Sequence, residues 1–522
     1  MGSASQYFTG MDYLLALPML LLTLFAVGIL LIDLILPREW KWANAITALA
    51  GLAFATAGVW RTQSFFNVHG LTVQTGFMGT LLVDRFAFFF FYLFLAGTAV
   101  AILMSVSYLE IERENHGEYY ALILFSVVGM MCMAAGFDVV LIFIGLELMA
   151  ISTYVLVGFL RRDQRSNEAA LKYMLLGAFS SGIFAYGLSL LYGVTGSTNL
   201  ALIGSKLQQI VVSNPGRADA VMVVALLTTA TGLLFKVAAI PFHQWAPDAY
   251  EGAPTSVTGF MSVSVKAAGW AMLLRVFGYP LLYGGVVYPM GLLPLRPVYV
   301  PLLVFVSLAT MTGANFAALT QNNLKRLLAY SSIAHVGYMM LGLIAGDAHN
   351  LNGDGIKGIL VYLLVYTFMN LGAFAVITSL RHRDVIGDEI DDIAGLYSRA
   401  PLEAVLMLTF LLSLAGIPPL AGFWGKYFIF LSLIESGHYT LAALAVLYSV
   451  FGLYYYLRIA NAMFMRQPLV KERLRPSLAM GLALFVTAFA TLAIGIFPNR
   501  LIESVNGVFS LTAAAPVAHL IR

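Results

Sequence analysis

Five ionisable side chains lie within apolar stretches of a chain that is otherwise poor in charge. They are one glutamate and four lysines: Glu147, Lys172, Lys236, Lys266 and Lys426. In hydrocarbon a charged side chain costs about 2.5–3.5 kcal/mol on insertion scales, so the five would together cost on the order of 12–17 kcal/mol. A cost of this size favours a role in moving ions or protons over a role in packing.

The chemistry open to such a set is proton transfer. Desolvation favours the neutral amine of a lysine, whereas a nearby carboxylate favours the ammonium. A lysine whose acidic neighbour approaches and recedes can therefore be switched between holding and releasing a proton. Several such groups in series would form a relay in which each charge state biases the next.

Two histidines extend this set, and each has two interpretations. His335, in RLLAYSSIAHVGYMM, can titrate near neutral pH and is either a bridge in the relay or a satisfied core histidine. His243 closely follows Pro241 and is either a structural residue, donating to backbone carbonyls that the proline frees, or a gating residue. Among the lysines, Lys172 lies about one turn from the polar SNEAA segment, so its ammonium can extend to the membrane interface.

The composition is that of an integral membrane protein. Of 522 residues, 60% are hydrophobic and only 11% are charged, against about 25% charged in soluble domains. The apolar stretches are about 20 residues long, which indicates helices and not barrel strands. Cys132 is the single cysteine, so a disulfide framework and an iron–sulfur cluster are excluded. The sequence also lacks nucleotide-binding motifs and Cys/His metal clusters, and we expect no metal, cofactor or nucleic acid on this chain.

The predicted fold is an all-α polytopic bundle of fourteen membrane spans, covering residues 1–522 without a soluble domain. The predicted spans are roughly 12–36, 43–62, 82–108, 118–136, 138–160, 168–193, 219–251, 254–278, 298–320, 327–345, 356–380, 401–437, 440–465 and 476–497. Loops that follow odd-numbered spans carry 15 of the 29 Lys and Arg residues, and loops and ends on the other side carry 9. This bias predicts that both termini lie outside the cell.

Two of the spans are interrupted by proline. Span 7 contains Pro241, five residues after Lys236, and span 12 contains Pro418 and Pro419, ahead of Lys426. Irregular backbone at membrane depth persists only where protein or a water-filled cavity surrounds it. Because the breaks lie five spans apart, spans 4–8 (118–278) and 9–13 (298–465) are predicted to be two inverted copies of one unit.

On these motifs the sequence resembles the antiporter-like membrane subunits of respiratory complex I, the proton-pumping NADH:quinone oxidoreductase, and among them the N-type subunit. The segments that carry the resemblance are GLELMAISTYVL, RSNEAALKYMLLGAFSSG, FKVAAIPFHQWAPDAYEGAPT, KRLLAYSSIAHVGYM and GIPPLAGFWGKYFIF. The resemblance implies a non-redox subunit of a translocase, with proton translocation by Glu147, Lys172, Lys236, Lys266, His335 and Lys426. Pumping would be driven by quinone reduction elsewhere in the complex.

The resemblance also implies where this subunit works and with what. NADH, flavin, iron–sulfur clusters and quinone would be bound in or near other subunits, although relatives in thylakoid membranes accept electrons from ferredoxin. The implied partners are sister antiporter-like subunits, small helical subunits and the lipid bilayer of the bacterial inner (plasma) membrane. The alternative function is a subunit of a multi-subunit cation/proton antiporter, which shares the same core.

Overall fold

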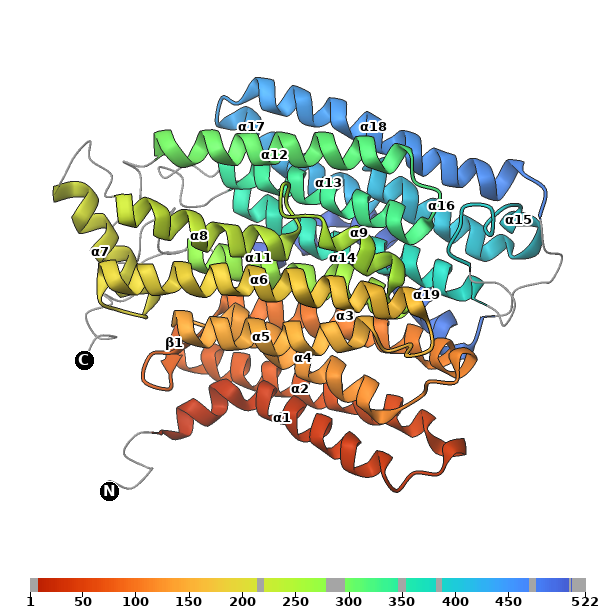
Figure 1. Ribbon diagram of the computed structural model, residues 1–522, viewed down its shortest axis with the longest axis horizontal. Helices are drawn as coiled ribbons and strands as arrows, with labels where there is room; N and C mark the ends of the chain where they lie inside the picture. Colours follow the sequence, from red (N-terminus) through yellow and green to blue (C-terminus); the bar gives the residue numbers. More distant parts are fainter. Residues whose placement is uncertain are drawn as a thin grey trace.

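The protein is a bundle of long helices that run along one common axis (Figure 1). The computed structural model describes residues 8–213, 220–277, 296–345, 354–381, 387–468, 476–506 and 508. Several of the basic residues used to predict orientation lie outside the described residues: Arg217, Arg383, Lys471, Arg473, Arg475 and Arg522.

Within the described ranges, thirteen helices are long and apolar enough to cross a membrane. The predicted twelfth span is made of two shorter helices, which completes the fourteen predicted segments. The uninterrupted spans include α1 (Gly10–Asp33), α2 (Trp42–His69), α3 (Arg85–Glu112), α4 (Gly117–Ala135), α5 (Val139–Val157), α6 (Gln164–Thr195), α12 (Arg296–Leu319), α13 (Leu324–Ala345), α14 (Asp354–Leu380), α18 (Tyr439–Met465) and α19 (Leu478–Ile496). The prediction of a helical polytopic fold is confirmed.

Close helix contacts rest on small residues, as is usual where lipid supplies no hydrophobic driving force between helices. A Cβ atom at Gly129 of α4 would lie 2.5 Å from the carbonyl oxygen of Gly145 on α5. Only glycine allows this approach, and it fixes the face that α5 turns toward the bundle. Glu147 follows two residues after Gly145.

The first predicted break is confirmed. Helix α8 (Ala220–Val237) ends just after Lys236, and α9 (Trp245–Gly252) resumes after a turn that contains Pro241. The chain leaves α8 through Ala238, whose φ of +61° is a left-handed conformation. The indole nitrogen of Trp245 donates to the carbonyl of Phe235 at 2.8 Å, so α9 satisfies part of the end of α8.

The second predicted break is confirmed as well. Helix α16 (Pro401–Ala415) is followed by its C-cap residue Gly416, whose φ is +90°, and α17 (Ala421–Glu435) begins after Pro418 and Pro419. The hydroxyl of Ser413 accepts a hydrogen bond of 3.0 Å from the amide of Gly422, which caps the start of α17. Each break therefore leaves two half-helices joined by a short irregular segment. The arrangement of the two units as inverted copies stays a prediction.

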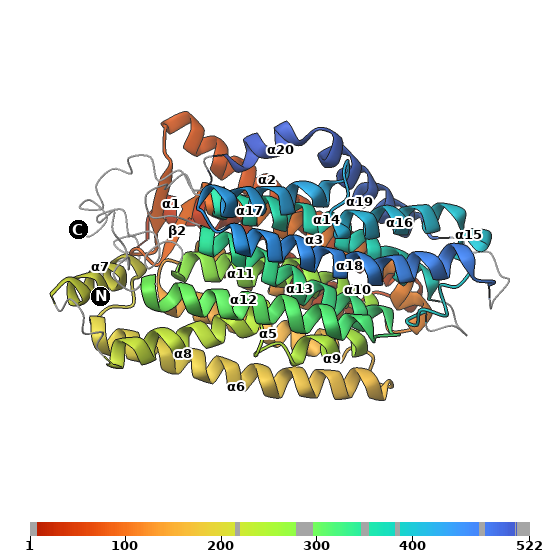
Figure 2. The same ribbon diagram turned by 90° about the horizontal axis from the view of Figure 1, so that it is seen from above.

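Span 8 is the buried centre of the bundle. It consists of α10 (Thr255–Phe260), a π-helical turn over Met261–Val265, and α11 (Lys266–Leu273). Figure 2 shows α10 and α11 in the interior, with α6 and α8 toward one face of the bundle and α2 and α20 (Pro498–Val505) toward the other. Single π-turns inside α-helices are frequent at functional sites, and this one ends immediately before Lys266.

Several short elements were not predicted, among them two strands, α7 (Leu200–Ser213), α15 (Leu396–Arg399) and α20. Strands β1 (Val73–Gly76) and β2 (Leu81–Asp84) form an antiparallel hairpin, and α7 and the short α15 lie in loops at opposite ends of the bundle (Figure 1). The predicted third span began at residue 82 and so absorbed part of β2. Its apolar residues continue directly into the helix, and hydrophobicity alone does not separate a short strand from a helix start.

Candidate functional site

Glu147 and Lys236 form the first part of the candidate site. The Lys236 side chain is buried in the last turn of α8, and its ammonium lies 5.6 Å from the ring centroid of Tyr154 on α5. Glu147 lies on the same helix as Tyr154, seven residues or about two turns earlier. Yet Oε1 of Glu147 and Nζ of Lys236 are both buried without a hydrogen-bond partner among the described residues. Glu147 therefore lies on the face of α5 that Lys236 approaches, but the two groups are not in contact.

Lys266 lies next along the interior, on α11. Its ammonium donates to the hydroxyl of Ser332 on α13 and lies 6.0 Å from the ring centroid of Tyr250 on α9. The backbones of spans 7 and 8 are close here, since a Cβ at Gly269 would lie 3.4 Å from the carbonyl carbon of Lys236. Lys266 is one turn from Gly269, so its backbone lies near that of Lys236.

His335 lies on α13, between two tyrosine hydroxyls. Nδ1 is 2.5 Å from the hydroxyl of Tyr362 on α14, and Nε2 is 3.1 Å from that of Tyr456 on α18. The hydroxyl of Tyr456 is also 2.5 Å from that of Ser331. Every ring nitrogen of His335 therefore has a partner that can both donate and accept.

Lys426 lies on α17, after the second break. Its ammonium donates to the carbonyl of Ala415 at 2.7 Å and lies 5.1 Å from the ring centroid of Tyr338. Ala415 is the last residue of α16, where carbonyl groups lack partners within their own helix. The partial negative charge of that helix end favours the ammonium form. Lys236 likewise belongs to the last turn of a half-helix, so both breaks associate a lysine with a carbonyl end.

Helix α13 connects the two halves of the candidate site. Ser332, His335 and Tyr338 are spaced three residues apart and so share one stripe of the helix. Ser332 contacts Lys266, and Tyr338 contacts Lys426, with His335 between them. At 1.5 Å per residue this stripe spans about 9 Å. The three deep lysines and the histidine of the site are only 2–7% exposed: Lys236, Lys266, Lys426 and His335.

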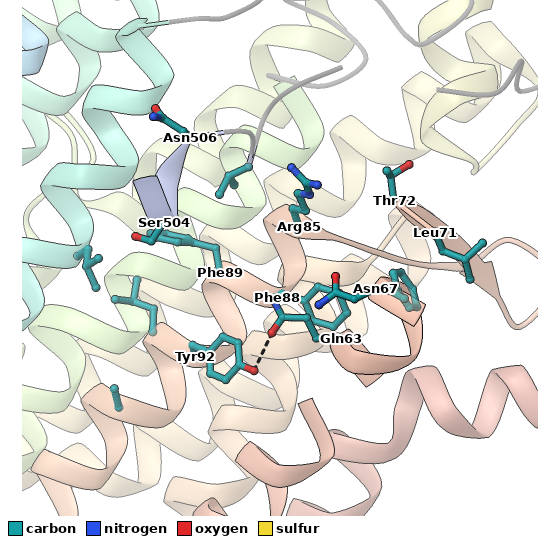
Figure 3. A pocket seen from close by; sticks show the side chains of 15 residues that line it. Gln63, Asn67, Leu71, Thr72, Arg85, Phe88, Phe89, Tyr92, Ser504 and Asn506 are labelled. Atoms are coloured by element: carbon teal, nitrogen blue, oxygen red, sulfur yellow. Dashed lines mark hydrogen bonds between the residues drawn. The ribbon is translucent and has the colours of Figure 1, made fainter. Parts of the chain in front are cut away.

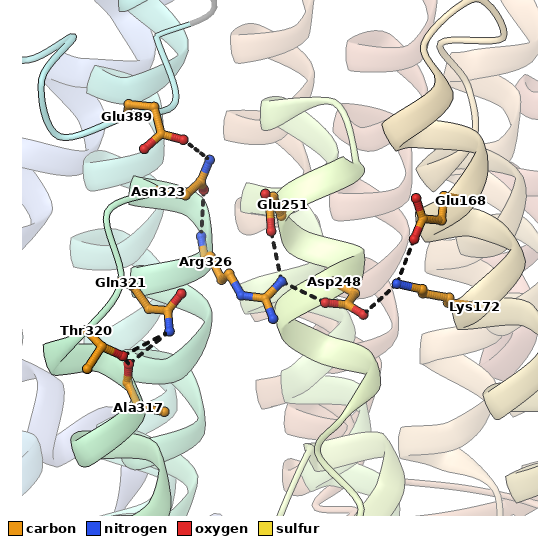
Figure 4. Close-up of polar contacts among 10 residues, drawn as sticks. All are labelled: Glu168, Lys172, Asp248, Glu251, Ala317, Thr320, Gln321, Asn323, Arg326 and Glu389. Atoms are coloured by element: carbon orange, nitrogen blue, oxygen red, sulfur yellow. Dashed lines mark hydrogen bonds and ion pairs between the residues drawn. The ribbon is translucent and has the colours of Figure 1, made fainter.

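Lys172 lies outside the interior line, by which we mean the series Glu147, Lys236, Lys266, His335 and Lys426. It lies on an outer face of α6 with 47% of its side chain exposed, and it pairs with Glu168 at 2.8 Å and Asp248 at 3.1 Å. Asp248 in turn pairs with Arg326 at 2.7 Å, and Arg326 with Glu251 at 2.8 Å (Figure 4). This surface network ties α6 and α13 to α9, the second half of broken span 7. Lys172 therefore contacts α9, the helix that follows the first break, from the outside of the bundle.

The remaining predicted residues lie at the breaks. Pro241 and His243 are in the turn between α8 and α9, and Pro418 and Pro419 are between α16 and α17. The ring of His243 is partly buried, and its structural and gating interpretations stay predictions. Across the parts of the chain that the structure describes, no group of three or more His, Cys, Asp or Glu residues could hold a metal ion.

Sequence reasoning missed the polar partners of the titratable groups. Ser332 and Tyr338 lie in the same motif as His335, and their spacing of three residues on either side of it is a signal that the sequence contains. Tyr362 and Tyr456 come from other helices. Nothing in the sequence distinguishes them from the other 24 tyrosines, because their role depends on how α13, α14 and α18 pack.

Known proteins share this architecture and sequence. Residues 136–452 match the family model described as NADH:quinone oxidoreductase/Mrp antiporter, transmembrane. The NADH-quinone oxidoreductase subunit N 1 of Koribacter versatilis is 64% identical over 525 residues, covering 100% of each chain. The subunit N 2 of Solibacter usitatus is 50% identical over 499 residues, covering 95% of this chain and 97% of that one.

Two solved structures extend the comparison. A chain of respiratory complex I from Thermus thermophilus is 32% identical with a TM-score of 0.74, covering 94% of this chain and 99% of its own. A chain of the Mrp complex from Dietzia is 21% identical with a TM-score of 0.80, covering 96% and 99%, a likeness of fold alone.

Proposed function

Because the chain belongs to the NADH:quinone oxidoreductase/Mrp antiporter family of transmembrane subunits, we propose that it moves protons along the interior line from Glu147 to Lys426. The chain is an N-type, antiporter-like membrane subunit of NADH-quinone oxidoreductase, and its partners are other subunits of that complex. The finer assignment is that it acts as a non-redox subunit of a translocase, driven by quinone reduction elsewhere in the complex.

The observation that carries the proposal is the stripe Ser332–His335–Tyr338 on α13. It places a hydroxyl, an imidazole and a phenol ring between the ammonium groups of Lys266 and Lys426. Hydroxyl and neutral imidazole groups both donate and accept, so a proton can enter from one neighbour and leave to the other. A purely structural core would satisfy its packing with apolar side chains and would not need two lysines here.

Protons would enter the interior line at Glu147 and Lys236, two groups that are not hydrogen-bonded to each other. A shift that brings the carboxylate to the ammonium would favour the charged lysine, and a shift that separates them would favour loss of the proton. Lys236 lies beside a break, where the backbone can change with little loss of helix hydrogen bonds. At the other end, Lys426 would hold its proton against the carbonyl of Ala415 until the second break changes.

We propose an orientation, neighbours and internal symmetry for the subunit. Both termini face the periplasm of a bacterial inner membrane, and the neighbours are sister antiporter-like subunits and small helical subunits. Residues 118–278 and 298–465 act as two inverted units, each contributing one broken span. Redox cofactors and quinone are bound by other chains of the complex.

The competing function is cation/proton exchange as a subunit of a multi-subunit antiporter. The likeness of fold to a chain of the Mrp complex favours this function. The relatives that are 64% and 50% identical over nearly the whole chain are NADH-quinone oxidoreductase subunits and support the first function.

Inverted membrane vesicles distinguish the two functions. We expect NADH oxidation to acidify vesicles that contain the wild-type complex, in the absence of sodium, and Lys236→Ala to abolish that acidification. Lys206→Ala, an exposed lysine on α7, is the matched control and should pump normally. Acidification that requires a sodium gradient but not NADH would instead support the antiporter.

A further inference from the structure

A cavity of about 590 Å³ lies apart from the interior line, at the place where α2 ends and α3 begins (Figure 3). Its walls come from α2 and α3, from Leu364 of α14, and from Ser504 at the end of α20. Helix α20 packs against α14 and α19, so this short helix closes one side of the cavity. The cavity opens at the end of the bundle that carries the β1–β2 hairpin.

The lining becomes mainly aromatic along α3, and within it the hydroxyl of Tyr92 donates to Oε1 of Gln63 on α2 at 2.9 Å. Arg85, the first residue of the helix, lies at the polar rim, and Phe88, Phe89 and Tyr92 follow toward the interior (Figure 3). Ala96 is the last residue of α3 in the lining. From Arg85 to Ala96 the helix rises about 16 Å, which is close to half of a hydrocarbon core about 30 Å thick. The cavity is therefore one membrane leaflet deep.

The rim carries an uncompensated positive charge. Arg85 is exposed, and within the described part of the chain it has no ion-pair partner. The neighbouring Asp84 is already engaged, because its two carboxylate oxygens bind the Arg275 guanidinium at 2.7 and 2.9 Å. Asp84 also accepts a hydrogen bond of 2.8 Å from the amide of Ala87 and so caps the first turn of α3. Asn67 and Thr72 add neutral hydrogen-bonding groups at the same rim.

We propose that this cavity binds an anionic phospholipid, with its phosphate at Arg85 and one acyl chain along the aromatic wall. A helix of a neighbouring subunit fits less well, because a spanning helix needs an apolar groove through both leaflets and this cavity is polar at one end. A quinone head carries no charge to match Arg85. The site is separate from the residues that are proposed to carry protons, so its test does not depend on pumping.

Lipid retention by the purified, assembled complex tests the proposal. Phospholipids that stay bound after detergent washing are counted by mass spectrometry for wild type and for Arg85→Gln. We expect Arg85→Gln to bind anionic phospholipid about fivefold more weakly, the factor expected when one basic residue loses its contact with an anionic headgroup. Arg500→Gln, an exposed arginine of α20 outside the lining, is the matched control and should retain lipid as wild type does. Equal retention in Arg85→Gln would overturn the proposal.

Two further variants separate the lipid from other occupants. Ala96→Leu fills the inner end of the cavity but leaves Arg85 in place, so it should also lower lipid retention, whereas a free phosphate ion at the rim would be unaffected. A photo-crosslinking residue at Tyr92 should yield an adduct with the mass of a phospholipid. An adduct with quinone, with a neighbouring subunit or with this chain's own C-terminal residues, or no adduct at all, would contradict the proposal.

Discussion

Replacing His335 by glutamine should separate proton transfer from packing at the middle of the bundle. Glutamine can still donate and accept hydrogen bonds, but it cannot take up a proton. Of the two tyrosine hydroxyls that contact His335, that of Tyr456 keeps its contact with Ser331, so at most the hydroxyl of Tyr362 loses its partner. One unsatisfied buried hydroxyl costs about 1–3 kcal/mol, which a bundle of this size should tolerate.

The expected loss of function is much larger than the loss of stability. Without a titratable group at residue 335, a proton would have to cross the stripe of about 9 Å between Ser332 and Tyr338 in one step. A positioned acid–base group contributes about 10²–10⁴-fold to a proton transfer, so we expect His335→Gln to lower pumping by at least about 10²-fold.

The assay is NADH-driven acidification of inverted vesicles, with assembly measured separately on native gels. His116→Gln serves as the control, because His116 has 51% of its side chain exposed and pairs only with Glu114 in the described structure. If His335→Gln assembled and pumped within about twofold of wild type, proton transfer through the imidazole would be refuted.

Glu147→Gln should leave assembly intact but sharply lower pumping, because it removes the charge that is proposed to act on Lys236; wild-type pumping in vesicles would reduce Glu147 to a packing role. Lys426→Arg should be impaired despite keeping its charge, because arginine does not release its proton; normal pumping would make Lys426 a fixed charge. Lys172→Ala should be the mildest lysine variant, losing less than about tenfold in pumping, because its solvent-exposed ion pairs contribute little; a loss as large as that of Lys236→Ala would contradict this ranking. A cysteine at position 163 in a Cys132→Ser background should be labelled only from the cytoplasm; labelling from the periplasm would reverse the orientation.

The breaks and the deep lysines were predictable because they violate the rules of an apolar helix. Pro241 and Pro418 cannot continue a helix, and the structure ends α8 and α16 before them. Lys236, Lys266 and Lys426 are expensive in hydrocarbon unless protein surrounds them, and all three are buried by the bundle. A proline or lysine within an apolar helix is unfavourable by its type alone. Such a residue can therefore be recognised from the sequence without knowing which helices pack against it.

The position of Lys172 could not be predicted in the same way. Its neighbours Leu171 and Leu175 are 53% and 59% exposed, and yet they are as apolar as residues of the interior. In a membrane the outer face of a helix is no more polar than its inner face, so periodicity does not tell which face is buried. Its partner Asp248 lies 76 residues away, beyond the break, and only the folding of α9 back along α6 brings the pair together.

Lys266 tests the central claim most directly, because it is the buried cation that joins the Glu147 end of the line to α13. The measurement is the rate of NADH-driven proton translocation by the complex reconstituted in liposomes, with Lys266→Met compared with wild type at equal assembly. Methionine fills similar space without a titratable group, so we predict a loss of at least about tenfold in translocation. Translocation by Lys266→Met at the wild-type rate would contradict a proton path through the interior of this chain.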